Sequence, residues 1–218
     1  MGLIVFYHPL IKPKDNQIRV ACVGDSLTYG FLTAGQLWNN YPSLLKKLLG
    51  DKYCVNNYGY TNHTASKNGD FPYVKRKIYR DSLDFNPDIV ILMLGSNDSK
   101  SFNWNNEEFK NDLDEIINSY KNLKSDIKII LMSPIPCYLF GNIEMYSIRD
   151  SVIKQEIRPI CLMLGKENNI DYIDLYLCFE NRKDLYAIDN VHLNKNGNQL
   201  IAETVYEHLM KGNVVWIS

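Results

Sequence analysis

Three short segments of the sequence contain residue types that together can carry out nucleophilic acyl transfer. Ser26 lies in the segment GDSL, Asn97 lies in GSND, and Asp189 and His192 lie in DNVH near the C-terminal end. A serine hydroxyl becomes an effective nucleophile when a histidine takes its proton and a carboxylate orients that histidine. We therefore expect Ser26 to be the nucleophile, His192 the base and Asp189 the carboxylate that orients it.

The same chemistry needs hydrogen-bond donors for the negative oxygen that develops on the attacked carbonyl. The backbone amide of Ser26 is one donor if Ser26 begins a helix, because the first N–H groups of a helix have no partner within it. The side-chain amide of Asn97 is a second donor, and the backbone amide of Gly59 is a third. These three groups form the predicted oxyanion hole.

Each segment taken alone is more often structural. A serine at this point commonly caps a helix, GSND is typical of a polar turn, and DNVH is typical of a surface loop. The positions of the segments favour chemistry, because Ser26, Gly59, Asn97 and His192 follow predicted strands or precede the final helix. Loops of this kind gather at one edge of a parallel sheet, so four independent candidates are expected to meet there.

The elements that must position these residues alternate between strands and helices. Near-continuous apolar runs predict buried strands at residues 18–23, 53–57, 88–94, 128–132 and 170–174. Helical spacing of apolar residues predicts helices at residues 41–49, 105–123, 147–164 and 195–209. We expect Pro159 to kink the third of these helices and Gly165 to end it. This alternation predicts a mostly parallel sheet that is covered by helices on both faces.

The segments GDSL, GSND and DNVH, together with Gly59, resemble the four sequence blocks of the SGNH hydrolases, also called GDSL esterases. The resemblance extends over roughly residues 18–210. It implies an α/β fold, a three-layer α/β/α sandwich with a five-stranded parallel sheet of flavodoxin-like type, in a single domain over residues 1–218. It also implies a Ser26–His192–Asp189 triad, an oxyanion hole from Ser26, Gly59 and Asn97, and no metal or organic cofactor.

The stretches GSNDSKSFNW and GDFPY are similar to a bacterial branch of this family described as carbohydrate or sialate O-acetylesterases. This similarity implies a short acyl group, acetyl above all, and a sugar as the esterified alcohol. Flat aromatic side chains can stack on sugar rings, and Tyr29, Tyr60 and Trp104 lie in or near the predicted active-site loops. We expect these three residues and Asp25 to contact the substrate, although Asp25 is also suited to bracing the turn before Ser26.

Two other functions are compatible with the same residues. The first is a lysophospholipase or acyl thioesterase of the same fold, which a preference for long acyl chains would reveal. The second is a carbohydrate-binding module on an inactivated hydrolase fold. All four polar residues of the expected site are present, whereas a site that has lost its activity is expected to have lost at least one of them.

Charge and cysteine content limit the remaining functional classes. The 24 basic and 25 acidic residues leave a net charge of -1, which gives no reason to expect a nucleic acid or an anionic membrane as partner. Five widely spaced cysteines without a CxxC pair suit a reducing compartment, and the chain lacks a signal-peptide pattern and any long apolar run. We therefore expect a cytoplasmic protein, with a longer exported precursor left open, while the oligomeric state is undetermined.

Overall fold

The fold is built on one sheet of five parallel strands, which a computed structural model describes within residues 8–211. The strand order is β2-β1-β3-β4-β5. Their bounds are β1 Ile18–Gly24, β2 Tyr53–Gly59, β3 Ile89–Met93, β4 Lys128–Met132 and β5 Asp171–Ile173. All five lie where the apolar runs predict them, and the parallel sheet is confirmed.

Alternation along the central strand explains why the sheet needs a helical layer on each face. In β1, Val20 and Cys22 belong to one core cluster, whereas Ala21 and Val23 belong to the other. All four side chains are fully buried. A strand that is apolar on both faces is stable only when both faces are covered.

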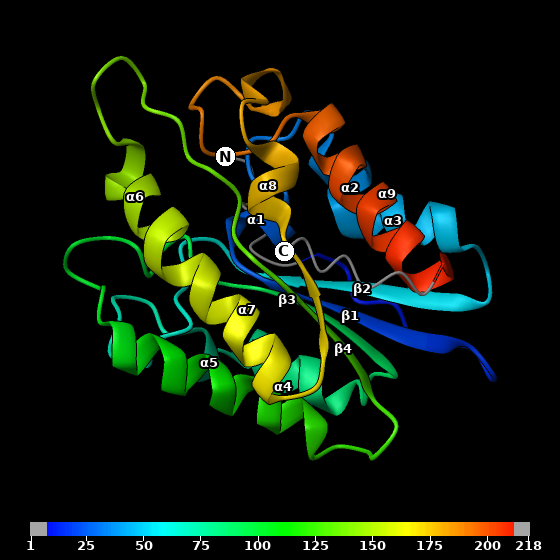
Figure 1. Cartoon of the computed structure of the whole chain (residues 1–218). Coiled ribbons are helices and arrows are strands. Elements are labelled where there is room, and N and C mark those ends of the chain that lie inside the picture. The colour runs from blue at the N-terminus through cyan, green and yellow to red at the C-terminus, as the bar shows by residue number, and fades with distance from the viewer. Residues whose placement is uncertain (1–7, 212–218) are drawn as a thin grey trace.

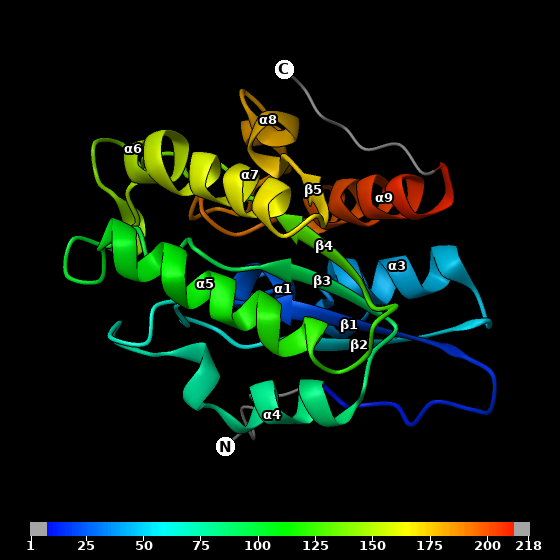
Figure 2. The same ribbon diagram turned by 60° about the horizontal axis from the view of Figure 1, so that its bottom comes forward.

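Helices cover the two faces as separate layers (Figures 1 and 2). One layer contains α4 Lys77–Asp84, α5 Asn106–Lys121 and α7 Arg158–Glu167, and the other contains α3 Tyr41–Leu49 and α9 Lys195–Lys211. The short helices are α1 Ser26–Tyr29, α2 Gln36–Asn39, α6 Asp150–Val152 and α8 Leu175–Phe179. The three-layer α/β/α sandwich of flavodoxin-like type is thus confirmed.

The helix that contains Pro159 differs from the sequence-based expectation. It is interrupted by a wider π turn over Ile153–Ile157, and Pro159 then lies in the first turn of α7, where its missing N–H is tolerated. Gly165 does not end the helix, which continues to Glu167; its lack of a side chain instead lets the helix approach Tyr172 of β5. Helix α4 was not predicted at all.

Capping residues define the helix ends nearest the site. Asn105 accepts a hydrogen bond from the Glu108 amide at the start of α5, and Asn194 accepts from the Asn196 and Gly197 amides before α9, as the sequence predicts.

None of the helices described between residues 8 and 211 is both long and apolar enough to span a membrane.

Candidate active site

The predicted nucleophile sits in a tight turn between β1 and α1. Asp25 caps α1, because its Oδ1 accepts a hydrogen bond from the Leu27 amide at 2.9 Å. Ser26 is the first residue of α1, so its own amide points out of the helix start without an intrahelical acceptor. Gly24 is required before this turn, since a side chain there would collide with Thr28 and with the Met93 carbonyl.

Ser26, His192 and Asp189 come together in the order that proton transfer requires. The Ser26 Oγ lies 2.9 Å from His192 Nε2, and His192 Nδ1 lies 2.6 Å from Asp189 Oδ2. All three side chains are buried. These distances place the hydroxyl, the imidazole and the carboxylate in one hydrogen-bonded chain, although 166 residues separate Ser26 from His192.

The Asp189 carboxylate is held in its charged form. Burial alone would raise its pKa, but hydrogen bonds from the His192 ring and from the backbone amides of His192 and Val191 lower the pKa to about 2. Asp189 is therefore ionised throughout the neutral pH range. A fixed negative charge at Nδ1 favours the tautomer in which Nε2 is free to accept the Ser26 proton.

Asn97 also lies at this site, and a buried carboxylate supports it. Its Nδ2 donates to the His63 carbonyl at 3.2 Å and more weakly to Asp25 Oδ2 at 3.4 Å. Asp25 is fully buried, and this burial raises its pKa to about 6. The expectation that Asp25 contacts substrate is therefore wrong; it is a positioning residue that links the Ser26 turn to Asn97.

The structure also speaks against Gly59 as an oxyanion donor. Its amide already donates to the Asn57 Oδ1 at 2.8 Å, and a side chain at Gly59 would collide with the backbone of Thr28 and Tyr29. Gly59 is thus needed for the close approach of β2 to α1. The wall of the site beside Asn97 is formed instead by Thr61 and Asn62, which follow β2.

Asn62 has a backbone conformation that suits a donor position. Its φ of 67° lies in the left-handed region, which asparagine adopts more readily than most other residues with a side chain. Within residues 8–211, its backbone amide has no hydrogen-bond partner. Asn62 therefore offers, in the same cavity as Ser26 and Asn97, the free amide that Gly59 lacks.

The cavity over Ser26 has a volume of about 310 Å³, at the lower end for small-molecule sites. Its lining comprises Ser26, Phe31, Thr61, Asn62, Asn97, Tyr146, Ile148 and His192. Phe31 and Tyr146 lie against His192, with ring centroids 4.9 and 5.5 Å from the imidazole centroid. Neither aromatic residue was predicted from the sequence. Phe31 was detectable because it follows the GDSL segment closely, whereas Tyr146 lies in a long loop after β4 that has no sequence signal.

The aromatic residues expected to contact substrate lie outside this lining. The Tyr60 ring packs on His63, with centroids 4.3 Å apart, and Trp104 donates from Nε1 to Glu156 at 3.1 Å. The Tyr29 carbonyl accepts hydrogen bonds from His8 and Gln36 at the far end of α1. The prediction that these three side chains line the sugar site is therefore not supported.

His63, in the loop after β2, is buried. Its Nδ1 lies 2.6 Å from the Thr61 carbonyl, and Arg76 Nε donates to its Nε2 at 2.7 Å. Burial, together with the charge of Arg76, lowers the pKa of His63 to about 4. His63 is therefore neutral and fixes the Thr61–His63 loop rather than acting as a base.

Ligand sets for other chemistry are not found in the part of the chain that the structure describes. No group of three His, Cys, Asp or Glu side chains there is arranged to hold a metal ion. The five cysteines are free thiols, and four of them are buried.

A sequence profile of the GDSL-like lipase/acylhydrolase family matches residues 22–200. The chain belongs to this family. The matched residues include the turn that contains Ser26, both loops that flank the cavity and the DNVH segment. The geometry of the site and the family membership therefore rest on the same residues.

Similarity to individual proteins extends beyond the family profile. An acetylxylan esterase from Xylanibacter ruminicola is 36% identical to this GDSL-like chain over 214 residues, which is 88% of the chain and 43% of the relative. The chain thus spans less than half the length of that curated relative.

Solved structures share the fold at lower identity. A carbohydrate acetylesterase from Sinorhizobium meliloti has a TM-score of 0.71 at 19% identity, covering 90% of this chain and all of that one. A lipase/acylhydrolase from Enterococcus faecalis has a TM-score of 0.72 at 22% identity, covering 88% of this chain and 95% of that one. At such identities the likeness establishes the fold that the two proteins share with this chain.

Proposed function

We propose that this protein is a serine esterase that removes acetyl groups from carbohydrates through an acyl-enzyme on Ser26. The observation that carries the proposal is the hydrogen-bonded chain from Ser26 Oγ through His192 to Asp189, with distances of 2.9 and 2.6 Å. The acetylxylan esterase relative supports acetyl as the acyl group and a sugar hydroxyl as the leaving group.

In the first half-reaction, Ser26 Oγ attacks the ester carbonyl while His192 Nε2 takes its proton. The negative oxygen of the tetrahedral intermediate accepts hydrogen bonds from the Ser26 amide and from Asn97 Nδ2. We assign the third donor to the Asn62 amide, in place of Gly59. His192 then protonates the departing alcohol, and the acetyl group stays on Ser26.

In the second half-reaction, His192 takes a proton from water, which attacks the acetyl-Ser26 carbonyl. The same three donors stabilise the second tetrahedral intermediate. Asp189 stays ionised throughout, because its pKa of about 2 lies far below neutral pH. Acetate leaves, and the proton returns to the Ser26 hydroxyl.

A second candidate, hydrolysis of long acyl esters or thioesters, is favoured by apolar side chains near the site. Phe31 and Tyr146 both line the cavity and are 38% and 48% exposed. Exposed apolar residues beside a cavity are suited to holding an acyl chain.

The test compares p-nitrophenyl acetate, butyrate, octanoate and palmitate as substrates, and measures acetate released from acetylated xylo-oligosaccharides. We expect the acetyl ester to have the highest kcat/KM, and acetate to be released by the native chain but not by Ser26→Ala. Highest activity on octanoate or palmitate would support the second candidate. Binding of the oligosaccharide without any turnover would instead indicate a carbohydrate-binding module.

A further inference from the structure

A buried lysine lies behind the two asparagines of the candidate oxyanion hole. Lys100 is 4% exposed, and its Nζ donates to the Asn62 Oδ1 at 2.6 Å. The same Nζ lies 3.6 Å from the Oδ2 of Asp70, which is its anionic neighbour. Burying an ammonium group is costly unless it is paired and hydrogen-bonded, so this arrangement must be held by specific contacts.

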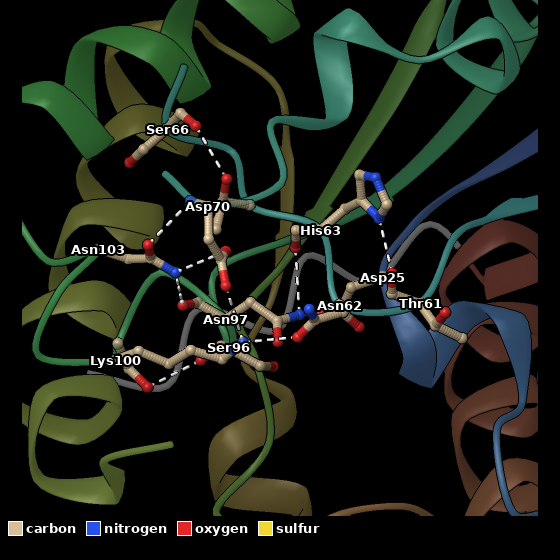
Figure 3. Close-up of polar contacts among 12 residues, drawn as sticks. Asp25, Thr61, Asn62, His63, Ser66, Asp70, Ser96, Asn97, Lys100 and Asn103 are labelled. Atoms are coloured by element: carbon tan, nitrogen blue, oxygen red, sulfur yellow. Dashed lines mark hydrogen bonds and ion pairs between the residues drawn. The ribbon is translucent and has the colours of Figure 1, made fainter. Parts of the chain in front are cut away.

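The same group of side chains extends to Asn97. Asn103 donates from Nδ2 to Asp70 Oδ1 at 2.9 Å and to the Asn97 carbonyl at 3.0 Å, while its Oδ1 accepts from the Asp70 amide. Figure 3 shows these polar side chains gathered around Asn62 and Asn97. Lys100 therefore belongs to one network that contacts the loop after β2 and the loop after β3.

Asn62 is the member of this network with a left-handed backbone, which costs asparagine less than it costs most residues with a side chain. A residue with a side chain in the left-handed region is less stable than in the right-handed region, by roughly 1 kcal/mol for most residue types. The loop keeps φ at 67° while the side chain of Asn62 is tied to Lys100 by a charge-assisted hydrogen bond. The neighbouring His63 is held by Arg76 and by the Thr61 carbonyl, whereas the Asn62 side chain is held by Lys100.

We propose that Lys100 is a positioning residue of the oxyanion hole, which anchors the Asn62 side chain and so keeps the Asn62 amide directed at the reacting carbonyl. The inference rests on the proposed esterase function, because the carbonyl in question is that of the ester. Lys100 itself does not touch the substrate; it is absent from the residues that line the cavity among those described.

The first test is kinetic, with p-nitrophenyl acetate as substrate. Loss of a whole oxyanion donor lowers kcat by about 100-fold or more, so a loosened donor in Lys100→Met should lower kcat by about 10-fold, with KM changed by less than about 3-fold. The control is Lys124→Met. Lys124 also contacts an aspartate, Asp88 at 2.6 Å, and a left-handed asparagine, Asn86, but at the opposite end of the sheet.

A double-mutant cycle with Asn62→Gly separates anchoring from other effects of the lysine. Glycine adopts the left-handed conformation without a side-chain anchor and has no contact with Lys100 to lose. We expect Asn62→Gly to lower kcat modestly, and Lys100→Met to lower it by no more than about 2-fold further in that background. An unchanged 10-fold effect of Lys100→Met in the Asn62→Gly background would overturn the proposal, as would equal kcat losses in Lys100→Met and Lys124→Met.

The crystal structure of Lys100→Met tests the same inference without any substrate. We expect Asn62 to leave the left-handed region and its side chain to lose its fixed position. Retention of φ near 67° with the loop unmoved would overturn the proposal. This outcome is distinct from failure of the proposed function, which would show as a native chain without esterase activity.

Discussion

Replacement of Asn97 by alanine tests whether its side-chain amide stabilises the transition state. In the free protein, Asn97 Nδ2 has one good acceptor, the His63 carbonyl at 3.2 Å, and one long contact to Asp25 Oδ2 at 3.4 Å. The hydrogen that faces Asp25 is therefore weakly bonded and available to a developing oxyanion. Removal of one such donor costs about 3 to 4 kcal/mol of transition-state stabilisation, or roughly 100- to 1,000-fold in kcat.

The same substitution also removes ground-state contacts, which must be separated from the kinetic effect. Loss of two neutral or weak hydrogen bonds is expected to lower the free energy of unfolding by about 1 to 3 kcal/mol. A matched control is Asn56→Ala. Asn56 is equally buried, and its side chain makes two hydrogen bonds to the Ile11 backbone at 2.8 and 2.9 Å, away from the cavity.

The assay is steady-state hydrolysis of p-nitrophenyl acetate, with urea unfolding of each variant measured in parallel. We expect Asn97→Ala to lose kcat with KM nearly constant, and Asn56→Ala to lose stability with little change in kcat. A kcat for Asn97→Ala within about 3-fold of the native value would refute the assignment of Asn97 to the oxyanion hole.

Three further variants or conditions test other parts of the account. Asp189→Asn should lower kcat by roughly 1,000-fold or more on p-nitrophenyl acetate, because an amide favours the wrong tautomer of His192; a loss below 10-fold would argue against the triad. Gly59→Ala should lower the midpoint of thermal unfolding by disturbing the contact of β2 with α1, and an unaltered midpoint would contradict the packing role given to Gly59. Burial raises the pKa values of Asp25 and Asp98 from 3.8 to about 6, so the folded protein binds protons that the unfolded chain has released between about pH 4 and pH 6. The free energy of unfolding should therefore fall as pH rises through this window, by at most about 3 kcal/mol for each group. The fall should be less steep in Asp25→Asn; an equal slope in that variant would exclude Asp25 as a source of the pH dependence.

The sheet was predictable because its strands are buried on both faces. Runs such as Ile18–Gly24 and Ile89–Met93 are apolar at almost every position, and this pattern has few alternatives when helical periodicity follows each run. Helix α4, Lys77–Asp84, was missed because it is mostly polar and has just two buried side chains. Its place in the fold depends on packing against the sheet, which local sequence does not encode.

The polar residues of the site were predictable to the extent that their type determines their chemistry. Ser26, Asn97, Asp189 and His192 lie together because each follows a strand or precedes α9 at one sheet edge. Gly59 misled the prediction because a glycine at a strand end suits both a donor amide and a close backbone contact. Two features of the folded chain distinguish these roles. They are the hydrogen bond from the Gly59 amide to the Asn57 side chain and the left-handed turn at Asn62.

Covalent labelling of Ser26 tests the central claim most directly. A fluorophosphonate reacts with a serine hydroxyl that a neighbouring base activates, and mass spectrometry of the digested protein locates the adduct. We predict a single adduct on Ser26, concurrent loss of esterase activity, and strongly slowed labelling in His192→Ala. An adduct on a different residue, or esterase activity that persists after Ser26 is fully labelled, would contradict the account.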